Sequence, residues 1–409
     1  MHRWNRALLT PVFYVALGLA VLAIVTYAGE GPGEMNDLEV FHRAGARFVR
    51  GEALYRVEDG HYELKYLPAS AALFAPLSLL PLGTAKVLWL AGCWLSLSLA
   101  FALTVRLFGD RLPWWAPLAA LLVMSRSIER EYAHGQINAF LMLLVVASFM
   151  LLEKRRDLCA GALITVAVLV KPPWLVLLPY LLVTRRWRAA ATMSALVLVG
   201  NALPALRYGV AGTFRLHADM NARLAASTAR LLTHPANISL PGALAKLTGA
   251  DLSVVGPVAV ALLVLPCVAL AWRIGHDRGR AAEDLAVVAP LAVLLSPQAW
   301  DYTVLTTLPT LLLAITVARR APWSVHMLTM FLSAVVALDY FVLFGRGASY
   351  AAVMRWSPNT WFLLWMLGVA LWVRSASPAL SSARRRWCRS RPPPAHEAPR
   401  AASPGSCSR

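Results

Sequence analysis

Long apolar runs alternate with short polar junctions along most of this chain, and the runs have the length of membrane-spanning helices. A helix needs roughly 20 apolar residues to cross the hydrocarbon core, and somewhat fewer where protein shields its ends. We therefore predict an all-α polytopic membrane protein with about twelve transmembrane helices. The predicted spans are 10–28, 84–105, 112–128, 136–152, 158–170, 173–184, 189–206, 252–272, 284–296, 302–318, 322–342 and 359–373.

Two apolar segments do not follow this pattern directly. Residues 68–83 contain three prolines, at positions 68, 76 and 81. Because proline interrupts helical hydrogen bonding, we interpret this segment as an interfacial or re-entrant piece. Residues 10–28 have the length of a secretory signal, but they lack a small-residue cleavage site and many spans follow them, so we interpret them as an uncleaved first helix.

The composition agrees with a membrane protein. Hydrophobic residues make up 58% of the 409 residues, whereas soluble domains contain roughly 45–50%. The net charge of +18 would suggest a nucleic-acid partner in a soluble protein. Here the basic residues gather at alternate junctions, so the positive-inside rule explains the charge and we expect no nucleic-acid partner.

The basic junctions predict the orientation in the cell membrane. If both termini are cytoplasmic, the inner junctions are "MHRWNR", "RLFGDR", "EKRRD", "TRRWR", "WRIGHDRGR", "ARR" and the tail "ARRRWCRSR". The polar and acidic junctions 29–67, 129–138, 207–251, 297–301 and 343–358 then face outward. We predict a transmembrane domain over 1–374, a basic, disordered cytoplasmic tail over 375–409, and any chemistry on the outer face.

The first outer segment has the pattern of an amphipathic helix. Apolar residues recur at helical spacing at Leu38, Phe41, Ala44, Gly45 and Phe48. Asn36 and Glu39 have the spacing of a capping box, and Gly51 is placed to end the helix. We expect this helix to lie on the outer membrane face with its apolar stripe toward the lipid.

Asp37, in the first turn of that helix, has two interpretations. An acid is favoured at this position by the helix dipole alone. A carboxylate at the membrane surface is also suited to act as a general base toward an attacking hydroxyl. Glu39 is only two residues away and faces another direction, so it is a capping partner rather than a second catalytic acid.

Six motifs occur in chain order over about residues 10–340. They are "DLEVFHRAGARFVRGEALY", "KYLPASAALFAPLSLLP", "HGQINAFLMLL", "VLVKPPWLVLLPYLLVTRRWR", "NISLPGALAKL" and "LLSPQAWDYTVLTTLP". Together they resemble the motifs of glycosyltransferase family 87, the bacterial polyprenol-phosphate-mannose-dependent α-(1→2) mannosyltransferases. The resemblance implies the C-type membrane glycosyltransferase fold. It also implies inverting transfer of a hexose, mannose first, from a polyprenyl-phosphate carrier to a glycolipid or glycan acceptor, with Asp37 as the base.

This sequence departs from the family pattern at three positions. Leu67 and Ser127 stand where a proline is usual, and Tyr302 follows Asp301 where histidine is often found. The last departure leaves the donor's sugar open, because a histidine there would lie near the donor phosphate. No Asp-x-Asp pair occurs in a predicted outer segment, so we expect no essential metal and no cofactor.

Lys171 is the main candidate for binding the donor phosphate. It lies between two apolar half-spans, beside Pro172 and Pro173. A charge in that place either snorkels to the interface or is buried for a function. The functional alternative is stabilisation of the leaving phosphate, with help from Arg126 or Arg130.

The remaining candidates would shape the sugar site. Gln136 and Asn138 begin a helix at the outer face, where amides suit sugar hydroxyls, whereas His134 is either a surface residue or part of the site. Trp300 is an interfacial anchor or a sugar platform. The predicted set is Tyr66, His134, Gln136, Asn138, Asn237, Trp300 and Asp301. The alternatives to an enzyme are a lipid or sugar transporter or flippase, and a scaffold protein.

Overall fold

The computed structural model describes residues 34–274, 280–318, 321–338, 340–345 and 347–389. Within these ranges all regular elements are helical and there is no strand. The α-helices are α2 (Asn36–Arg50), α3 (Pro68–Ser78), α4 (Leu82–Phe108), α5 (Ala116–His134), α6 (Asn138–Glu153), α7 (Asp157–Val170), α8 (Leu177–Val183), α9 (Trp187–Ala202), α10 (Ala205–Leu231), α11 (Leu240–Thr248), α12 (Leu252–Ile274), α13 (Ala281–Leu294), α14 (Leu308–Ala318), α15 (Trp323–Ala337), α16 (Tyr340–Phe344), α17 (Ala348–Arg355) and α18 (Pro358–Arg389). The 3₁₀ helices are η1 (Val57–Tyr62), η2 (Gly109–Arg111), η3 (Pro172–Val176) and η4 (Asp301–Thr307).

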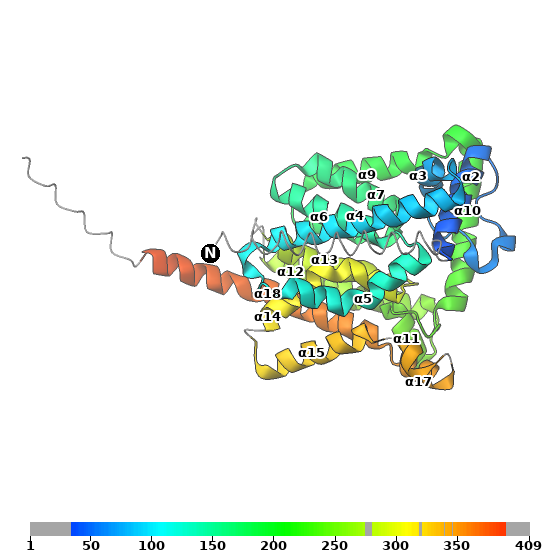
Figure 1. Ribbon diagram of the computed structural model, residues 1–409. Helices are drawn as coiled ribbons and strands as arrows, with labels where there is room; N and C mark the ends of the chain where they lie inside the picture. The colour runs from blue at the N-terminus through cyan, green and yellow to red at the C-terminus, as the bar shows by residue number, and fades with distance from the viewer. Residues whose placement is uncertain (1–33, 275–279, 319–320, 339, 346, 390–409) are drawn as a thin grey trace, which may run out of the picture.

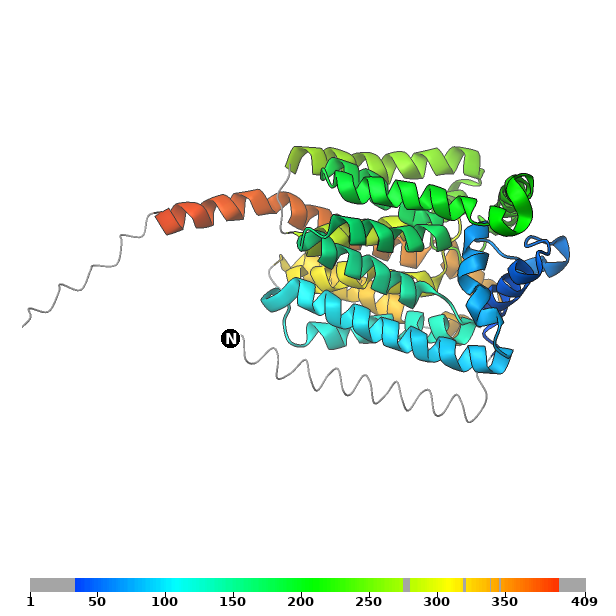
Figure 2. The ribbon, with the colours of Figure 1, turned by 90° about the horizontal axis from the view of Figure 1, so that it is seen from above.

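The long helices lie side by side in one bundle. Figures 1 and 2 show α2, α3 and α10 gathered at one end of this bundle, whereas α18 projects beyond the other. We call the first of these the α2 end. α18 continues as a helix to Arg389, past the predicted boundary at residue 374, and residues 390–409 of the predicted tail lie outside the described residues.

The predicted spans coincide largely with helices wherever the structure describes them, and the first span, 10–28, lies outside the described residues. The all-helical prediction is therefore confirmed. By length and composition, however, only three described helices are able to cross a membrane: α4, α12 and the combined η4–α14 helix. Counting the bent pairs α5–α6 and α9–α10 as one span each raises the number to five. Helices such as α7, with 14 residues, are too short to cross alone.

The first outer helix, α2, is present, but the predicted capping box is wrong. Met35 occupies the N-cap position in a left-handed conformation, and no side chain caps the helix start. Asn36 donates to side chains outside the helix, and Glu39 pairs with Lys86 at 2.8 Å. The predicted end is confirmed, because Gly51 adopts the positive φ of 72° that a C-terminal cap requires.

The apolar face of α2 packs against protein rather than lying free on a lipid surface, which corrects the predicted arrangement. Phe41 is 3% exposed and its ring stacks on Phe74 of α3 at 4.7 Å. At Gly45 an added Cβ would come within 2.5 Å of the Phe74 carbonyl oxygen. The two helices therefore approach closely, and the proline-containing segment 68–83 supplies a short helix on which α2 rests.

The segment 207–251, predicted as a polar outer junction, is mostly helix. α10 runs from Ala205 to Leu231 and bends at Gly209, whose φ and ψ are 69° and 172°. This helix crosses the α2 end of the bundle (Figure 1). Tyr208 donates a hydrogen bond to the Glu52 carbonyl oxygen at 2.8 Å, which attaches α10 to the segment that follows α2.

An ion pair fixes the loop between α2 and α3. Arg47 of α2 is buried and forms two hydrogen bonds with the carboxylate of Asp59 in η1. Arg43 donates to the Tyr62 carbonyl oxygen at 2.6 Å. Burial alone would raise the pKa of Asp59, but the hydrogen bond from Arg47 and the nearby arginine charges lower it below its ordinary value.

We expect the Asp59→Asn variant to be less stable than the wild type at neutral pH. A depressed pKa means that the Asp59 carboxylate adds stability above its unfolded-state pKa of about 4 and loses it as the pH falls through the folded-state value. Thermal unfolding of both proteins between pH 3 and 8 should therefore show a difference that shrinks toward acid. Glu58→Gln, at an exposed neighbouring position, is the control. An equal effect of both substitutions would contradict this assignment.

Candidate active site

Asp37 is half-buried and lies against the turn between α5 and α6. The Gln136 side chain donates from Nε2 to Asp37 Oδ2 at 2.6 Å. The backbone N–H of Met35 donates to the Ala133 carbonyl oxygen at 3.2 Å, so the chain just before α2 is docked on the same turn. The side chain of Asp37 is therefore held in place by Gln136, a residue that is 99 positions away in the sequence.

Gly135 makes this docking possible. Its φ of 64° is in the left-handed region that ends α5. A Cβ on residue 135 would also lie 2.8 Å from the Leu38 Cβ and 3.1 Å from the Met35 Cβ. Both the turn and the close approach of α2 therefore require glycine.

The start of α6 organises a buried carboxylate. Glu131 is 0% exposed. Its two oxygens accept hydrogen bonds from the Asn138 side chain at 2.7 Å and from the Ala139 backbone N–H at 2.8 Å. Glu131 thus satisfies a free donor at the N-terminus of α6, where the helix dipole also favours a negative charge.

Lys171 completes this chain of hydrogen bonds. Its Nζ donates to Asn138 Oδ1 at 2.7 Å. The same nitrogen lies 5.8 Å from the ring centres of Tyr66 and Tyr302, within the range of cation–π attraction. Its charge also interacts with the carboxylates of Glu131 and Asp37. The ammonium group therefore points toward protein partners, which does not fit a side chain that snorkels to the interface.

Local chain chemistry explains why Lys171 is available at this position. α7 ends at Val170, and the two following prolines have no backbone N–H to continue the helix. Lys171 itself has an extended backbone, with φ −124° and ψ 99°. The break turns its side chain toward the α5–α6 junction, where it meets Asn138.

The predicted residues Asp37, Gln136, Asn138, Lys171 and Tyr66 therefore meet at the α2 end of the bundle. They come from α2, the α5–α6 junction, the α7 break and the loop before α3. Sequence reasoning missed Glu131, because "SRSIEREYAHGQIN" reads as a polar junction. The available signal was an acid shortly before a new helix start, a position from which a carboxylate can cap that helix.

Asp301 acts as a connector between helices. Its Oδ2 lies 3.6 Å from Arg126 Nε, and its Oδ1 accepts from the Tyr302 backbone N–H at 2.9 Å. Its carbonyl oxygen accepts from Ser127 Oγ at 3.0 Å. These contacts join α5 to η4 and place the Tyr302 ring beside Lys171.

The second arginine candidate, Arg130, lies near an acid of its own helix. Its Nε is 3.5 Å from Glu129 Oε2. Phosphate binding by Arg126 and Arg130 stays a prediction.

The other aromatic candidates lie around this centre. The His134 ring is 5.8 Å from the Tyr302 ring. The Trp300 ring is 5.3 Å from His234 in an edge-on arrangement. His134 thus borders the Lys171 site through Tyr302, whereas Trp300 faces the segment that follows α10.

Asn237 has a structural role, which corrects the prediction that it binds sugar. The residue is 0% exposed. Its amide nitrogen donates to the carbonyl oxygens of Leu231, Leu232 and Pro297, and its oxygen accepts from the backbone N–H groups of Ser239 and Ala299. Because the amide's hydrogen-bonding capacity is used by backbone groups, Asn237 joins two chain segments and has none left for a ligand.

Two basic side chains in the loop before α3 lie close to Asp37. Burial lowers the pKa of His61, and the charge of Lys65 lowers it further while Asp37 opposes the shift. Burial also lowers the pKa of Lys65, against the charges of Glu63 and Asp37. Burial beside Asp37 therefore disfavours the protonated form of both side chains, and the carboxylate of Asp37 partly offsets this effect.

Comparison with known proteins links this site to a family. Residues 65–297, more than half of the chain, match the sequence model of glycosyltransferase family 87. The matched segment includes Gln136, Asn138 and Lys171, and Asp37 precedes it.

Curated relatives fall into two groups by name. An alpha-(1->3)-arabinofuranosyltransferase of Corynebacterium glutamicum is 30% identical over 159 residues, which is 37% of this chain and only 38% of that protein. Polyprenol-phosphate-mannose-dependent alpha-(1-2)-phosphatidylinositol pentamannoside mannosyltransferases match over longer stretches. The one from Mycobacterium tuberculosis is 27% identical over 71% of this chain and 68% of its own length. The one from Mycolicibacterium smegmatis is 26% identical over 93% and 86%.

We expect Glu131→Gln to lower the thermal midpoint markedly, because it removes a fully buried carboxylate that accepts hydrogen bonds from Asn138 and Ala139. A hydrogen bond to a charged group contributes about 1.5–3 kcal/mol. Glu129→Gln is the matched control, since the Glu129 side chain is 59% exposed and should tolerate neutralisation. Differential scanning calorimetry of both purified variants measures the effect. Equal midpoints for the two variants would show that Glu131 carries no structural charge.

Proposed function

The chain belongs to glycosyltransferase family 87 and is a membrane glycosyltransferase, and from that premise we propose that it transfers a hexose, most simply mannose, from a polyprenyl-phosphate carrier to a glycolipid or glycan acceptor. One observation carries the proposal: a carboxylate, Asp37, and an ammonium group, Lys171, lie in one site, and each is held by a neighbouring amide, Gln136 or Asn138. Two relatives matched over most of the chain are named for dependence on polyprenol-phosphate-mannose.

In this proposal Asp37 acts as the general base. It takes the proton of an acceptor hydroxyl, whose oxygen attacks the sugar's anomeric carbon from the face opposite the phosphate. The bond between that carbon and the phosphate oxygen breaks, the electron pair leaves with polyprenyl phosphate, and the anomeric configuration inverts. The hydrogen bond from Gln136 fixes the direction of the carboxylate, which lowers the cost of reaching the reactive geometry.

Lys171 would stabilise the departing phosphate. Phosphate that leaves as a monoester gains negative charge, and a cation already held in position stabilises that charge more in the transition state than in the ground state. Asn138 holds the Lys171 ammonium group through a 2.7 Å hydrogen bond. Arg126 and Arg130 already lie beside the acids Asp301 and Glu129, so Lys171 is the primary phosphate ligand in this proposal.

Gln136 also offers a place for a hydroxyl group of the substrate. In the described part of the chain its Oε1 is buried and has no hydrogen-bond partner. Leaving a buried acceptor unpaired is costly, and a sugar or acceptor hydroxyl would satisfy it. We place the sugar between Gln136, Asn138 and the rings of Tyr66 and Tyr302, with His134, Trp300 and Asp301 around them.

The finer topology belongs to the same proposal. Twelve spans in the C-type arrangement, with both termini cytoplasmic, would place Asp37 and Lys171 at the outer face of the cell membrane. The basic junctions of the sequence support this orientation. The gathering of the site residues at one end of the bundle also favours a surface enzyme over a transporter, which places its ionisable groups near the bilayer midplane.

Donor identity is tested by direct assay. Purified full-length protein is incubated with a lipid extract and either radiolabelled polyprenyl-phosphate-mannose or polyprenyl-phosphate-arabinofuranose. We expect a labelled glycolipid from the mannose donor. Product from the arabinofuranose donor alone would overturn the choice of mannose and would agree with the shorter match to the arabinofuranosyltransferase. Product from neither donor would overturn the proposed donor class.

Asp37→Asn should abolish transfer while leaving the protein folded. Loss of a general base lowers the rate by about 10²–10⁴-fold, and asparagine still accepts the Gln136 hydrogen bond. Glu39→Gln, in the same helical turn and paired with Lys86 outside the site, is the matched control and should keep near-normal turnover. Initial rates at saturating donor, with thermal midpoints to verify folding, distinguish the two. Normal turnover by Asp37→Asn would remove Asp37 as the base.

A further inference from the structure

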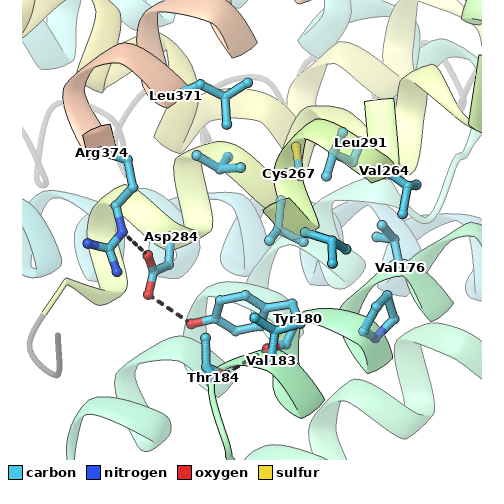
Figure 3. Close-up of a pocket in the computed structure, with 14 residues that line it drawn as sticks. Val176, Tyr180, Val183, Thr184, Val264, Cys267, Asp284, Leu291, Leu371 and Arg374 are labelled. Carbon is cyan, nitrogen blue, oxygen red and sulfur yellow. Dashed lines mark hydrogen bonds and ion pairs between the residues drawn. The ribbon is translucent and has the colours of Figure 1, made fainter. Parts of the chain in front are cut away.

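A cavity lies between α8, α12, α13 and α18, and no residue of the Asp37 site lines it (Figure 3). Its volume is about 70 Å³. After the helix break at Lys171 the chain continues through η3 into α8. Thr184, directly after α8, is on the cavity wall. Most of the remaining wall is aliphatic, with Val176, Val183, Val264, Val287, Val288, Leu291 and Leu371 among its members.

The cavity lies beside a peripheral helix. On α12, Leu262 and Leu265 are 57% and 63% exposed, whereas Leu263 between them is buried. Apolar side chains exposed on a membrane protein face lipid. Cys267 and Val264, on the protein-facing side of the same helix, line the cavity (Figure 3). One helix therefore separates the cavity from the hydrocarbon of the bilayer.

One end of the cavity is polar. Arg374 Nε donates to Asp284 Oδ1 at 2.7 Å, and the Tyr180 hydroxyl donates to the other oxygen of Asp284 at 3.1 Å (Figure 3). Arg374 is only 8% exposed, yet within the described ranges its Nη1 has no hydrogen-bond partner. A buried guanidinium donor left unpaired is costly, so this end is built to accept an oxygen atom from outside the protein.

The surroundings of this end are positively charged. Arg280 donates to the Arg374 carbonyl oxygen at 3.3 Å, and the charge of Arg186 acts at Tyr180. Arg185 is exposed on the turn between α8 and α9, and Arg188 is exposed in the first turn of α9. The acids here already have arginine partners, as in the pair between Glu283 and Arg111. An anionic group is therefore favoured over a neutral one.

We propose that this cavity binds an anionic phospholipid, at a site separate from the donor site. A segment of one acyl chain occupies the aliphatic part between α12 and the core. A phosphate or ester oxygen of the same lipid accepts the free N–H of Arg374, and the arginines of the α8–α9 turn lie near the remaining headgroup charge. Water in the cavity would also satisfy Arg374, so the test has to distinguish lipid from water.

The test uses the full chain reconstituted in nanodiscs that contain equal amounts of phosphatidylglycerol and phosphatidylcholine. After transfer to detergent, native mass spectrometry counts the lipids that remain bound. We expect the wild type to retain one phosphatidylglycerol. Cys267→Trp, which fills the cavity, should retain none. Cys159→Trp is the matched control, because Cys159 is exposed on α7 and does not line the cavity, and it should retain the lipid.

A substitution of Arg374 tests the polar end of the cavity independently. Arg374→Lys keeps a cation beside Asp284 but removes the second nitrogen. Retention of phosphatidylglycerol should fall about tenfold, the loss expected for one charge-assisted hydrogen bond. Three results would overturn the proposal: a wild type without bound lipid, equal retention by Cys267→Trp, or equal retention of the two lipids. Because the readout is bound lipid and not transfer, it is independent of the proposed glycosyl transfer.

Discussion

The two opposite charges at the α5–α6 junction, Glu131 and Lys171, constrain the rest of this structure. Glu131 is fully buried and Lys171 is half-buried at one end of an apolar bundle, where an unpaired charge would cost several kcal/mol. Asn138 stands between them and hydrogen-bonds to both. A carboxylate that caps one helix is thereby joined to a lysine at the end of another, so the positions of α5, α6 and α7 depend on one another.

The same junction also connects the bundle to the segment outside it. Gln136 directs its side chain to Asp37, while its carbonyl oxygen accepts a hydrogen bond from Trp89 of α4 at 3.1 Å. Four residues, 135 to 138, therefore determine where the carboxylate of α2 and the ammonium group of Lys171 stand relative to each other. Positioning of this kind lets a protein bring opposite charges into one site without letting them neutralise each other in direct contact.

Local chemistry in the sequence was enough to predict most helices and several of the residues that the fold brings together. Apolar runs predicted the helices, and Lys171 was identifiable because two prolines and two apolar runs surround it. The shortness of helices such as α7, the path of α10 and the contacts of Glu131 could not be predicted in this way. Each depends on how separate segments pack, and a bend of 119° between α5 and α6 hides which polar residues face inward. The prediction that Asn237 binds sugar failed for the same reason, because only the fold reveals that backbone groups use all the hydrogen-bonding capacity of its amide.

The glycine at position 135 has a consequence for how such a chain can diversify. Because Leu38 and Met35 lie against a turn that has no room for a side chain, the outer segment and the first half of the bundle form one mechanical unit. An exchange of residues 34–66 between relatives would therefore keep Asp37 in its present position only together with a matching turn. Surfaces that do not touch this contact, by contrast, are free to vary between relatives without moving Asp37 relative to the α5–α6 turn.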